Sequence, residues 1–423
     1  MKRKRVLVFP CGSEIALEIY RSLKNSTHFE LIGANSVSDH GRFVFENYIG
    51  DVPFVTDERF IPAIKEIVRR EQIDFLYPAM DSVITRLKAA EEELGCAVIS
   101  SPKDTTEICL SKEKTYKALS ALIKTPRVYT EGSIPSFPVF CKPEVGYGSR
   151  GTKKITDEFM LRQHLAEFPD SMILEYLPGE EYTVDCFTDR NGKLIFCGAR
   201  SRNRISNGIS VNTSPMENDG EFRKIAEIVN ENLRFRGAWF LQLKRDTQGE
   251  LVLLELASRL GGSSALFRAR GVNFAQLSLF DMMDIPVGII DNGYEIEMDR
   301  ALDNRYKINI RYDEVFMDFD DTLILEKEKY NTQAMSFVLD CINRGIRVSL
   351  LTCHHGDLEQ ALERFHLKPF FDRVIHVKDG ETKADHIDNT NAIFIDDSYA
   401  ERLRVRKKSG IPVFSVDMLE VLK

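Results

Sequence analysis

The spacing of apolar and polar positions divides the chain into three regions. In the first hundred residues, short apolar runs alternate with stretches of helical spacing, and Ser13 and Asp81 are placed to cap two of these helices. This alternation is typical of repeated βαβ units and predicts a small parallel sheet. The expected strands are residues 5–9, 30–35, 74–79 and 97–101, and the expected helices are 14–23, 60–70 and 82–94.

Residues 101–309 have longer runs in which apolar and polar side chains alternate, a pattern that predicts antiparallel strands. These runs are residues 172–177, 181–189, 193–203, 238–246 and 251–260. From residue 312 the βα alternation returns, with strands expected at 314–320, 347–352, 373–377, 391–397 and 411–416. We therefore predict an α/β multidomain protein with domains at 1–100, 101–311 and 312–423.

Composition narrows the functional classes. The net charge of -8 over 423 residues disfavours a general nucleic-acid binder, which needs a basic face. We find neither an apolar run long enough to span a bilayer nor a signal peptide, so we expect a cytoplasmic protein without a membrane partner. The eight cysteines form no CxxC pair, and we expect buried free thiols, Cys353 among them.

The segment VFCKPEVGYGSRG, residues 139–151, is the first chemical signal. An expected strand presents Lys142, and Gly146, Gly148 and Gly151 follow directly. Lysine offers a charge for phosphate oxygens, and glycines let backbone N–H groups approach an anion closely. On this segment alone, a hairpin with a surface lysine is an equal alternative.

Further oxygen-bearing side chains follow in order. Glu175 ends one expected strand, and Glu181 begins the next. Gln242 and Glu255 lie on the two strands of a predicted hairpin, followed by Arg259 and two glycines. Oxygen ligands on adjacent strands suit a hard ion such as Mg²⁺ that carries nucleotide phosphates.

The order of these motifs over residues 1–309 resembles the ATP-grasp ligases, near their carbamoyl-phosphate-synthase-like branch. The resemblance implies a Rossmann-like domain followed by two α+β lobes that close on ATP and Mg²⁺, or Mn²⁺ in its place. It implies phosphate contacts from Lys112, Lys142 and the loop Gly146 to Gly151, a hinge of Glu175, Tyr176 and Leu177 against adenine, ribose contacts from Glu181, metal ligands Gln242 and Glu255, and Arg259 facing the transferred phosphoryl group.

One position departs from the family pattern. The family reads Glu-x-Asn-x-Arg on its last strand, whereas this chain has Ala257 between Glu255 and Arg259. Alanine cannot coordinate a metal, so water fills that position, metal binding is weaker, or turnover is lost. We favour retained activity, in which ATP phosphorylates a small-molecule carboxylate and an amine or similar nucleophile displaces phosphate.

Two arginines are candidates for substrate binding. Arg202 and Arg204 are two residues apart and share one face if their strand continues. Two guanidinium groups could then clamp a carboxylate or phosphate, and a solvated strand end is the alternative.

The last region contains the segment VFMDFDDTLIL, residues 315–325. Asp318 and Asp320 point the same way if both lie on the strand, and Asp396 and Asp397 end a later strand. The carboxyl ends of parallel strands share one sheet edge, so these acids could meet around Mg²⁺. Thr352 ends a third strand, and a lysine, Lys383 or the rival Lys378, follows.

This set resembles the haloacid dehalogenase (HAD) superfamily of phosphatases over residues 314–423, with DxDxT matched by Asp318, Asp320 and Thr322. The resemblance implies that Asp318 attacks phosphorus and Asp320 acts as general acid and base. It implies that Thr352 and Lys383 hold phosphoryl oxygens. It also implies that Asp318, Asp396 and the Asp320 backbone carbonyl hold Mg²⁺, with Asp397 nearby.

The short spacing of these motifs leaves no room for a cap domain. About thirty residues separate Thr322 from Thr352, and about as many separate Thr352 from Lys383. HAD enzymes without a cap have open sites. His354 and His355 follow Thr352, and we weigh substrate contact against an ordinary surface position for them.

The leading hypothesis is an ATP-dependent ligase fused to a phosphatase that acts on a phosphorylated substrate, in sequence with the ligase. An ATP-binding regulatory module with only the phosphatase active is the alternative, and Ala257 supports it. A nucleic-acid end phosphatase ranks third. The substrates and the oligomeric state stay open.

Overall fold

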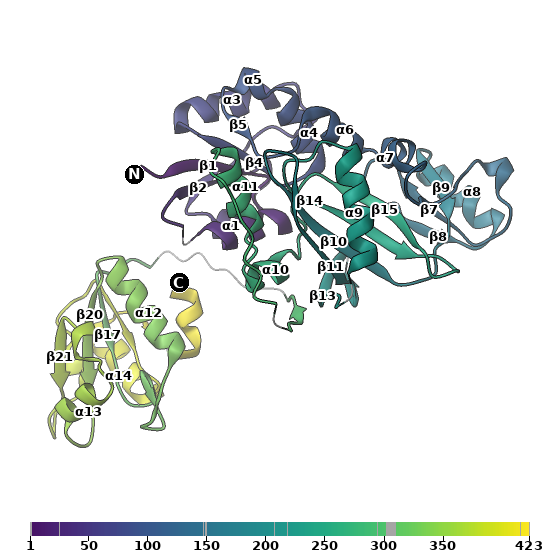
Figure 1. The fold of residues 1–423 in the computed structure, drawn as a ribbon. Helices are drawn as coiled ribbons and strands as arrows, with labels where there is room; N and C mark the ends of the chain where they lie inside the picture. Colours follow the sequence, from purple (N-terminus) through teal and green to yellow (C-terminus); the bar gives the residue numbers. More distant parts are fainter. Residues whose placement is uncertain are drawn as a thin grey trace. The chain divides into compact units, whose positions relative to one another are not determined.

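The computed structural model (Figure 1) contains two compact units, Met1–Leu302 and Asp303–Lys423, which are described separately. It describes residues 2–422 apart from positions 25, 147, 149, 207, 218, 294, 302–309 and 415. Within these residues, no helix has the length and apolar character needed to cross a membrane. The predicted domain boundaries, after residues 100 and 311, stay predictions.

The first unit begins with a five-stranded sheet in the order β3-β2-β1-β4-β5. All of its strand pairs are parallel, as the sequence predicts. Its strands are β1 (Lys4–Phe9), β2 (Phe29–Ala34), β3 (Asn47–Ile49), β4 (Phe75–Pro78) and β5 (Ala97–Val98). Its helices are α1 (Glu14–Leu23), α2 (Gly41–Val44), α3 (Phe60–Glu71), α4 (Asp81–Ala89) and α5 (Glu91–Leu94).

The two predicted helix caps have different outcomes. The Ser13 hydroxyl accepts a hydrogen bond from the Ala16 backbone N–H and caps α1, as expected. The prediction for Asp81 is wrong, because Asp81 is the first residue of α4 and its cap residue, Met80, makes no side-chain bond. The Asp81 carboxylate has a partner elsewhere, described below.

The rest of the first unit has antiparallel sheets, as predicted. The sheet β6-β9-β7-β8 contains β6 (Val128–Tyr129), β7 (Val139–Pro143), β8 (Lys153–Ile155) and β9 (Ser171–Glu175). The sheet β11-β10-β14-β15 contains β10 (Glu181–Thr188), β11 (Leu194–Ser201), β14 (Gly237–Arg245) and β15 (Leu251–Ala257). A third sheet pairs β12 (Arg204–Ser206), β13 (Ile209–Thr213) and β16 (Met298–Asp299).

Helices flank these sheets. They are α6 (Lys103–Leu110), α7 (Lys112–Leu119), α8 (Glu158–Glu167), α9 (Gly220–Asn232), α10 (Ala265–Arg270) and α11 (Phe274–Met282). Helix α9 packs against β11 and β10, where its Phe222, Ala226 and Val229 enter the same core as Trp239. Burying these apolar faces is the main force that holds helix to sheet.

A single core joins the start of the first unit to its later elements. Val6, Val8 and Tyr77 of the parallel sheet pack in one cluster with Phe187 and Phe267. Each of these side chains is at most 3% exposed. The parallel sheet is therefore bound to the antiparallel region by apolar packing.

The second unit has a parallel sheet in the order β21-β20-β17-β22-β23. Its strands are β17 (Glu314–Met317), β20 (Arg347–Thr352), β21 (Arg373–His376), β22 (Ala392–Ile395) and β23 (Val413–Phe414). Helices α12 (Thr332–Asn343), α13 (Leu358–Arg364) and α14 (Tyr399–Ser409) connect strands, and β18 (Ile324–Leu325) pairs with β19 (Lys329–Tyr330). The parallel sheet agrees with the prediction, but the first strand stops at Met317 and not at residue 320.

All eight cysteines are free, and most are buried as expected. Cys353 is a correction, because it is exposed. It follows Thr352, the last residue of β20, where the chain leaves the sheet core.

Candidate active sites

A cavity of about 380 Å³ lies in the first unit. Its wall includes the β1–α1 turn, the start of α4, the glycine loop and strands β10, β11, β14 and β15. Most residues predicted to bind ATP, metal or substrate line this cavity: Lys112, Lys142, Gly146, Gly148, Glu175, Tyr176, Leu177, Glu181, Arg202, Gln242, Glu255 and Arg259. Gly151 and Arg204 do not line it.

Two buried lysines lie in the cavity wall without a carboxylate partner among the described residues. Lys142 Nζ donates to the Leu254 carbonyl oxygen at 2.9 Å and lies 5.5 Å from the Tyr116 ring centre. Lys112 Nζ is 3.3 Å from the Glu144 carbonyl oxygen. Two buried ammonium groups without an acid leave positive charge that an anionic ligand can balance.

The pKa of Lys142 is lowered to about 7, chiefly by burial and then by the neighbouring Lys112 cation, whereas Glu255 and Glu181 act in the opposite direction. Lys142 is 7% exposed, so water does little to stabilise its charged form. Its protonation therefore depends on what occupies the cavity.

We expect nucleotide binding to consume protons at about pH 8. The free Lys142 amine is mostly neutral above its pKa of about 7, and a polyphosphate anion raises that pKa because it stabilises the ammonium form. Calorimetric titration with Mg-ATP in two buffers of different ionisation enthalpy measures this uptake. Uptake should fall toward zero well below pH 7, and in Lys142→Arg, whose guanidinium stays charged. Equal uptake by Lys142→Arg and the unmodified chain would contradict the assignment.

Backbone angles and one ring contact describe the glycine loop and the hinge. Gly148 and Gly151 have positive φ angles of 62° and 67°, which favour glycine. Gly151 lies against Pro143 and Phe168, outside the cavity lining. At the hinge, the Lys154 ammonium lies 4.3 Å from the Tyr176 ring centre, a cation–π contact that fixes the ring.

Four polar side chains form a row across the antiparallel sheet. The backbone register pairs Arg200 with Thr183, Thr183 with Gln242, and Gln242 with Glu255. All four line the cavity. The register therefore places the two predicted metal ligands side by side, with carboxylate and amide oxygens of the kind that Mg²⁺ prefers.

Arg259 is held by the start of α4. Its Nε lies 3.0 and 2.9 Å from the two Asp81 oxygens, and its Nη2 lies 2.7 Å from Oδ2. The guanidinium carbon is also 5.2 Å from the Phe240 ring centre. Asp81 thus orients the arginine that the resemblance assigns to the transferred phosphoryl group.

The predicted arginine clamp is wrong in its geometry. Strand β11 ends at Ser201 and β12 begins at Arg204, so no continuous strand carries both arginines. Arg202 pairs with Glu181 at 2.8 Å inside the cavity wall, whereas the exposed Arg204 pairs with Asp299 at 2.8 Å. Only Arg202 keeps a predicted role in substrate binding.

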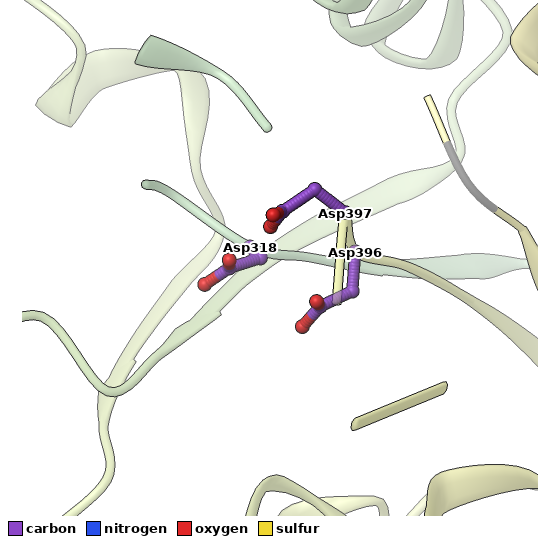
Figure 2. Close-up of side chains that lie close together, drawn as sticks. All are labelled: Asp318, Asp396 and Asp397. Carbon is purple, nitrogen blue, oxygen red and sulfur yellow. The ribbon is translucent and has the colours of Figure 1, made fainter. Parts of the chain in front are cut away.

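The second unit gathers three carboxylates at the ends of β17 and β22 (Figure 2). Oxygens of Asp318, Asp396 and Asp397 all lie within 4.8 Å of one another. Lys383 Nζ is 2.7 Å from both Asp318 Oδ1 and Asp396 Oδ2. The three acids offer oxygen ligands to one divalent cation, and Lys383 offers the positive charge that a phosphoryl group needs.

The titration of this cluster reflects crowding. Burial, and then the Asp318 charge, raises the pKa of Asp396 to about 6. Burial also raises the pKa of Asp318, although Lys383 opposes the shift. Burial would lower the pKa of Lys383, but the two carboxylates outweigh it and raise that pKa. A bound cation would relieve this repulsion.

Asp320 differs from the expectation. The chain leaves the strand at Met317 and turns at Asp321, where φ is 52°, so Asp318 and Asp320 do not share a strand face. The Asp320 carboxylate lies 2.8 Å from His354 Nδ1, and the cluster of three acids contains Asp397 in its place. The predicted metal contact of Asp320 through its backbone carbonyl stays a prediction.

The other predicted residues of this site have clear positions. Thr352, at the end of β20, donates its hydroxyl to Asp318. Lys383 is buried against the acids, whereas its rival Lys378 is exposed. His354 contacts Asp320, whereas His355 is exposed.

Sequence reasoning missed Arg200, Asp185 and the contact of Asp81 with Arg259. Arg200 and Asp185 are charged residues within otherwise apolar strands, at 2% exposure each, and this local signal could have identified them. The Asp81 contact spans 178 residues, and no local pattern indicates it.

Three solved structures have a fold similar to that of the first unit. The biotin carboxylase domain of Hydrogenobacter thermophilus 2-oxoglutarate carboxylase, in complex with magnesium ADP, matches with a TM-score of 0.58, 15% identity and coverage of 69% of this chain and 72% of that chain. L-amino acid ligase from Bacillus licheniformis matches with a TM-score of 0.54 and 18% identity, and the match covers 66% of this chain and 74% of that chain. Rhizobium etli pyruvate carboxylase matches with a TM-score of 0.57 and 16% identity. The match covers 69% of this chain but only 29% of that chain, so this chain spans under a third of the carboxylase.

The chain is an α/β multidomain protein, and its first unit has the ATP-grasp fold. A family model described as ATP-grasp in the biosynthetic pathway with Ter operon matches residues 167–298. A search of curated proteins found no match. ATP-grasp relatives bind ADP with Mg²⁺, as in the Hydrogenobacter thermophilus complex.

Proposed function

We propose that the first unit is an ATP-dependent ligase that joins a small-molecule carboxylate to an amine or similar nucleophile. The observation that carries this proposal is the cavity, whose lining includes Gln242, Glu255 and two buried lysines without an acid partner in the described part of the chain. Its volume of about 380 Å³ falls within the range of small-molecule sites. The ATP-grasp fold and the ligase from Bacillus licheniformis support the same class.

The proposed reaction has two steps. A carboxylate oxygen of the substrate attacks the γ-phosphorus of ATP, and ADP leaves with the electrons of the broken P–O bond. The amine then attacks the carbonyl carbon of the acyl phosphate, loses a proton, and phosphate leaves. In this scheme Lys112 and Lys142 neutralise the phosphates, and Arg259, oriented by Asp81, faces the transferred group.

Mg²⁺ fits the pair Gln242 and Glu255, whose backbone register places them opposite one another. When bound, it would neutralise charge on the phosphate oxygens. Ala257 lies on the same strand, paired with Phe240, and contributes no ligand. The alternative that Ala257 favours is an ATP-binding regulatory module without turnover.

We further propose that the second unit is a HAD-type phosphatase. Asp318 attacks phosphorus as a nucleophile, and Asp320 gives its proton to the leaving oxygen as the P–O bond breaks. Asp320 then takes a proton from water, which attacks the aspartyl phosphate and releases phosphate. Lys383 and Thr352 hold the phosphoryl oxygens, and Asp318, Asp396 and Asp397 suit Mg²⁺, which would neutralise charge there.

The two proposed activities could be successive steps on one substrate, and the phosphatase would act on the ligase's substrate or product. The cytoplasmic location and the oligomeric state stay predictions.

The test follows ADP and phosphate separately in the full chain. We expect one acid and amine pair, in a panel with ATP and Mg²⁺, to stimulate ADP formation. Working in the Asp318→Asn background keeps phosphate from the second unit out of the assay. Tight ATP binding without acid-dependent ADP from any panel member would favour the regulatory alternative.

A further inference from the structure

Four arginines on or beside the cavity wall are each paired with one carboxylate, so their charges balance. The pairs are Arg200 with Asp185 at 2.6 Å, Arg202 with Glu181 at 2.8 Å, Arg259 with Asp81 at 2.7 Å, and Arg300 with Glu14. What distinguishes them is which guanidinium nitrogens are left for a ligand.

Arg200 has a terminal nitrogen without a partner. Its side chain is 3% exposed, and its Nε donates to Asp185 Oδ2 at 2.6 Å, but its buried Nη1 has no hydrogen-bond partner among the residues that the structure describes. In Arg259 and Arg300, by contrast, the Nη1 atoms lie near the Leu260 carbonyl and the Ser263 hydroxyl. Buried charged donors are rarely left unpaired, because the loss of hydration is costly.

The position of Arg200 relative to the predicted metal ligands is fixed by the sheet. Arg200 on β11 and Gln242 on β14 are both paired with Thr183 of β10, one on each side. Two strand spacings separate their backbones, about 10 Å. Arg200 therefore lies in the same row as the predicted metal ligands, and across the cavity wall from them.

Gly261 lies directly against the Arg200–Asp185 pair. A Cβ atom at Gly261 would lie 3.1 Å from Arg200 Nη2 and 2.9 Å from Asp185 Oδ1. Both Arg200 and Gly261 line the cavity. A side chain at position 261 would press on the pair, so glycine lets the guanidinium keep its place at the cavity wall.

We propose that Arg200 binds a second anionic group on the acid that the ligase activates. This inference rests on the proposed ligase function and names its substrate class: an acid with one carboxylate to be phosphorylated and a second oxyanion, carboxylate or phosphate. Asp185 fixes the guanidinium through Nε, and the terminal edge presents planar donors that match an oxyanion. Arg200 is thereby a specificity-determining residue.

The test compares three acids of matched length on the full chain with saturating Mg-ADP. The probes are pentanoate with one charge, glutarate with two carboxylates, and 4-phosphonobutanoate with a carboxylate and a phosphonate. Calorimetry should show at least one dianion binding about tenfold or more tighter than pentanoate. The tighter dianion shows whether the second group is a carboxylate or a phosphate.

The variants separate recognition from folding. Arg200→Gln combined with Asp185→Asn keeps the buried pair neutral, and it should lose the preference for dianions while it still binds Mg-ADP. Arg162→Gln, an exposed arginine of α8 paired with Glu158, should keep the preference. Phosphonate binding by the second unit is the same in both proteins. Subtracting the binding heat of the double variant from that of the unmodified chain therefore removes this contribution.

Two results would overturn the role of Arg200. One is equal affinity, or none, for pentanoate and both dianions in the unmodified chain. The other is an unchanged preference in the double variant. Failure of the unmodified chain to bind Mg-ATP would instead reject the ligase function itself.

Discussion

Asp318→Asn is expected to lower the rate of phosphate release from p-nitrophenyl phosphate by a factor of roughly 10⁴ or more, as for other lost nucleophiles. An amide of the same size cannot form the aspartyl phosphate. Lys383 keeps its contact with Asp396, at 2.7 Å, so the pocket around the variant stays paired. Release of p-nitrophenol with Mg²⁺ present measures the effect.

The neighbouring Asp321 provides the matched control for this variant. Asp321 is exposed, and its carboxylate accepts from the Glu326 backbone N–H at 3.1 Å, away from the three clustered acids. Asparagine adopts its positive φ readily, so Asp321→Asn should keep activity within about twofold. If Asp318→Asn kept its turnover, the nucleophile assignment would be wrong.

Lys142→Met is expected to lower acid-dependent ADP formation, and the affinity for Mg-ATP, by about 10²-fold. Methionine fills a similar volume but cannot neutralise a phosphate, and a charged hydrogen bond in a buried site contributes about 1.5–3 kcal/mol. The substitution removes the hydrogen bond to the Leu254 carbonyl and the contact of the amine with the Tyr116 ring, and no ion pair among the described residues, so the fold should persist. Calorimetry for binding and coupled ADP detection for turnover measure both effects.

A second lysine of the same region serves as the control. Lys117 lies on α7 with Lys112 but is exposed and outside the cavity lining. Lys117→Met should bind Mg-ATP like the unmodified chain. Equal affinity of Lys142→Met and Lys117→Met would remove Lys142 from the phosphate site.

The hairpin that carries Gln242 and Glu255 was predictable from sequence. Strict alternation fixes which side chains share a face, and the short turn between the strands fixes their register. The register that runs out from the turn would place Gln242 opposite Leu254, but an irregularity between Gln242 and Leu243 shifts it by one residue and pairs Gln242 with Glu255, which the sequence did not indicate. The same logic located the acids after β17 and β22, because parallel strands share one carboxyl edge.

The pattern fails where hydrogen-bond partners change. Arg202 and Arg204 keep the two-residue spacing of a strand face, but the ladder of β11 with β10 ends at Ser201, and Arg204 pairs with Asn212 of β13. Strand ends are set by the neighbouring strand and not by the strand's own sequence. The partners of Asp81 and Asp320, which are Arg259 and His354, lie far away in sequence, so the local pattern did not predict them.

The ion pair between Asp81 and Arg259 limits where the chain can be cut into fragments that fold on their own. Residues 1–100 read as a separate module in sequence, yet Asp81 holds the guanidinium that follows β15, and Val6 and Tyr77 share a core with Phe267. A fragment that began at residue 101 would leave Arg259 without its acid and would expose that core to water. The smallest transplantable form of the proposed ligase therefore includes the amino-terminal sheet, and engineers who exchange such modules should move residues 1–302 together.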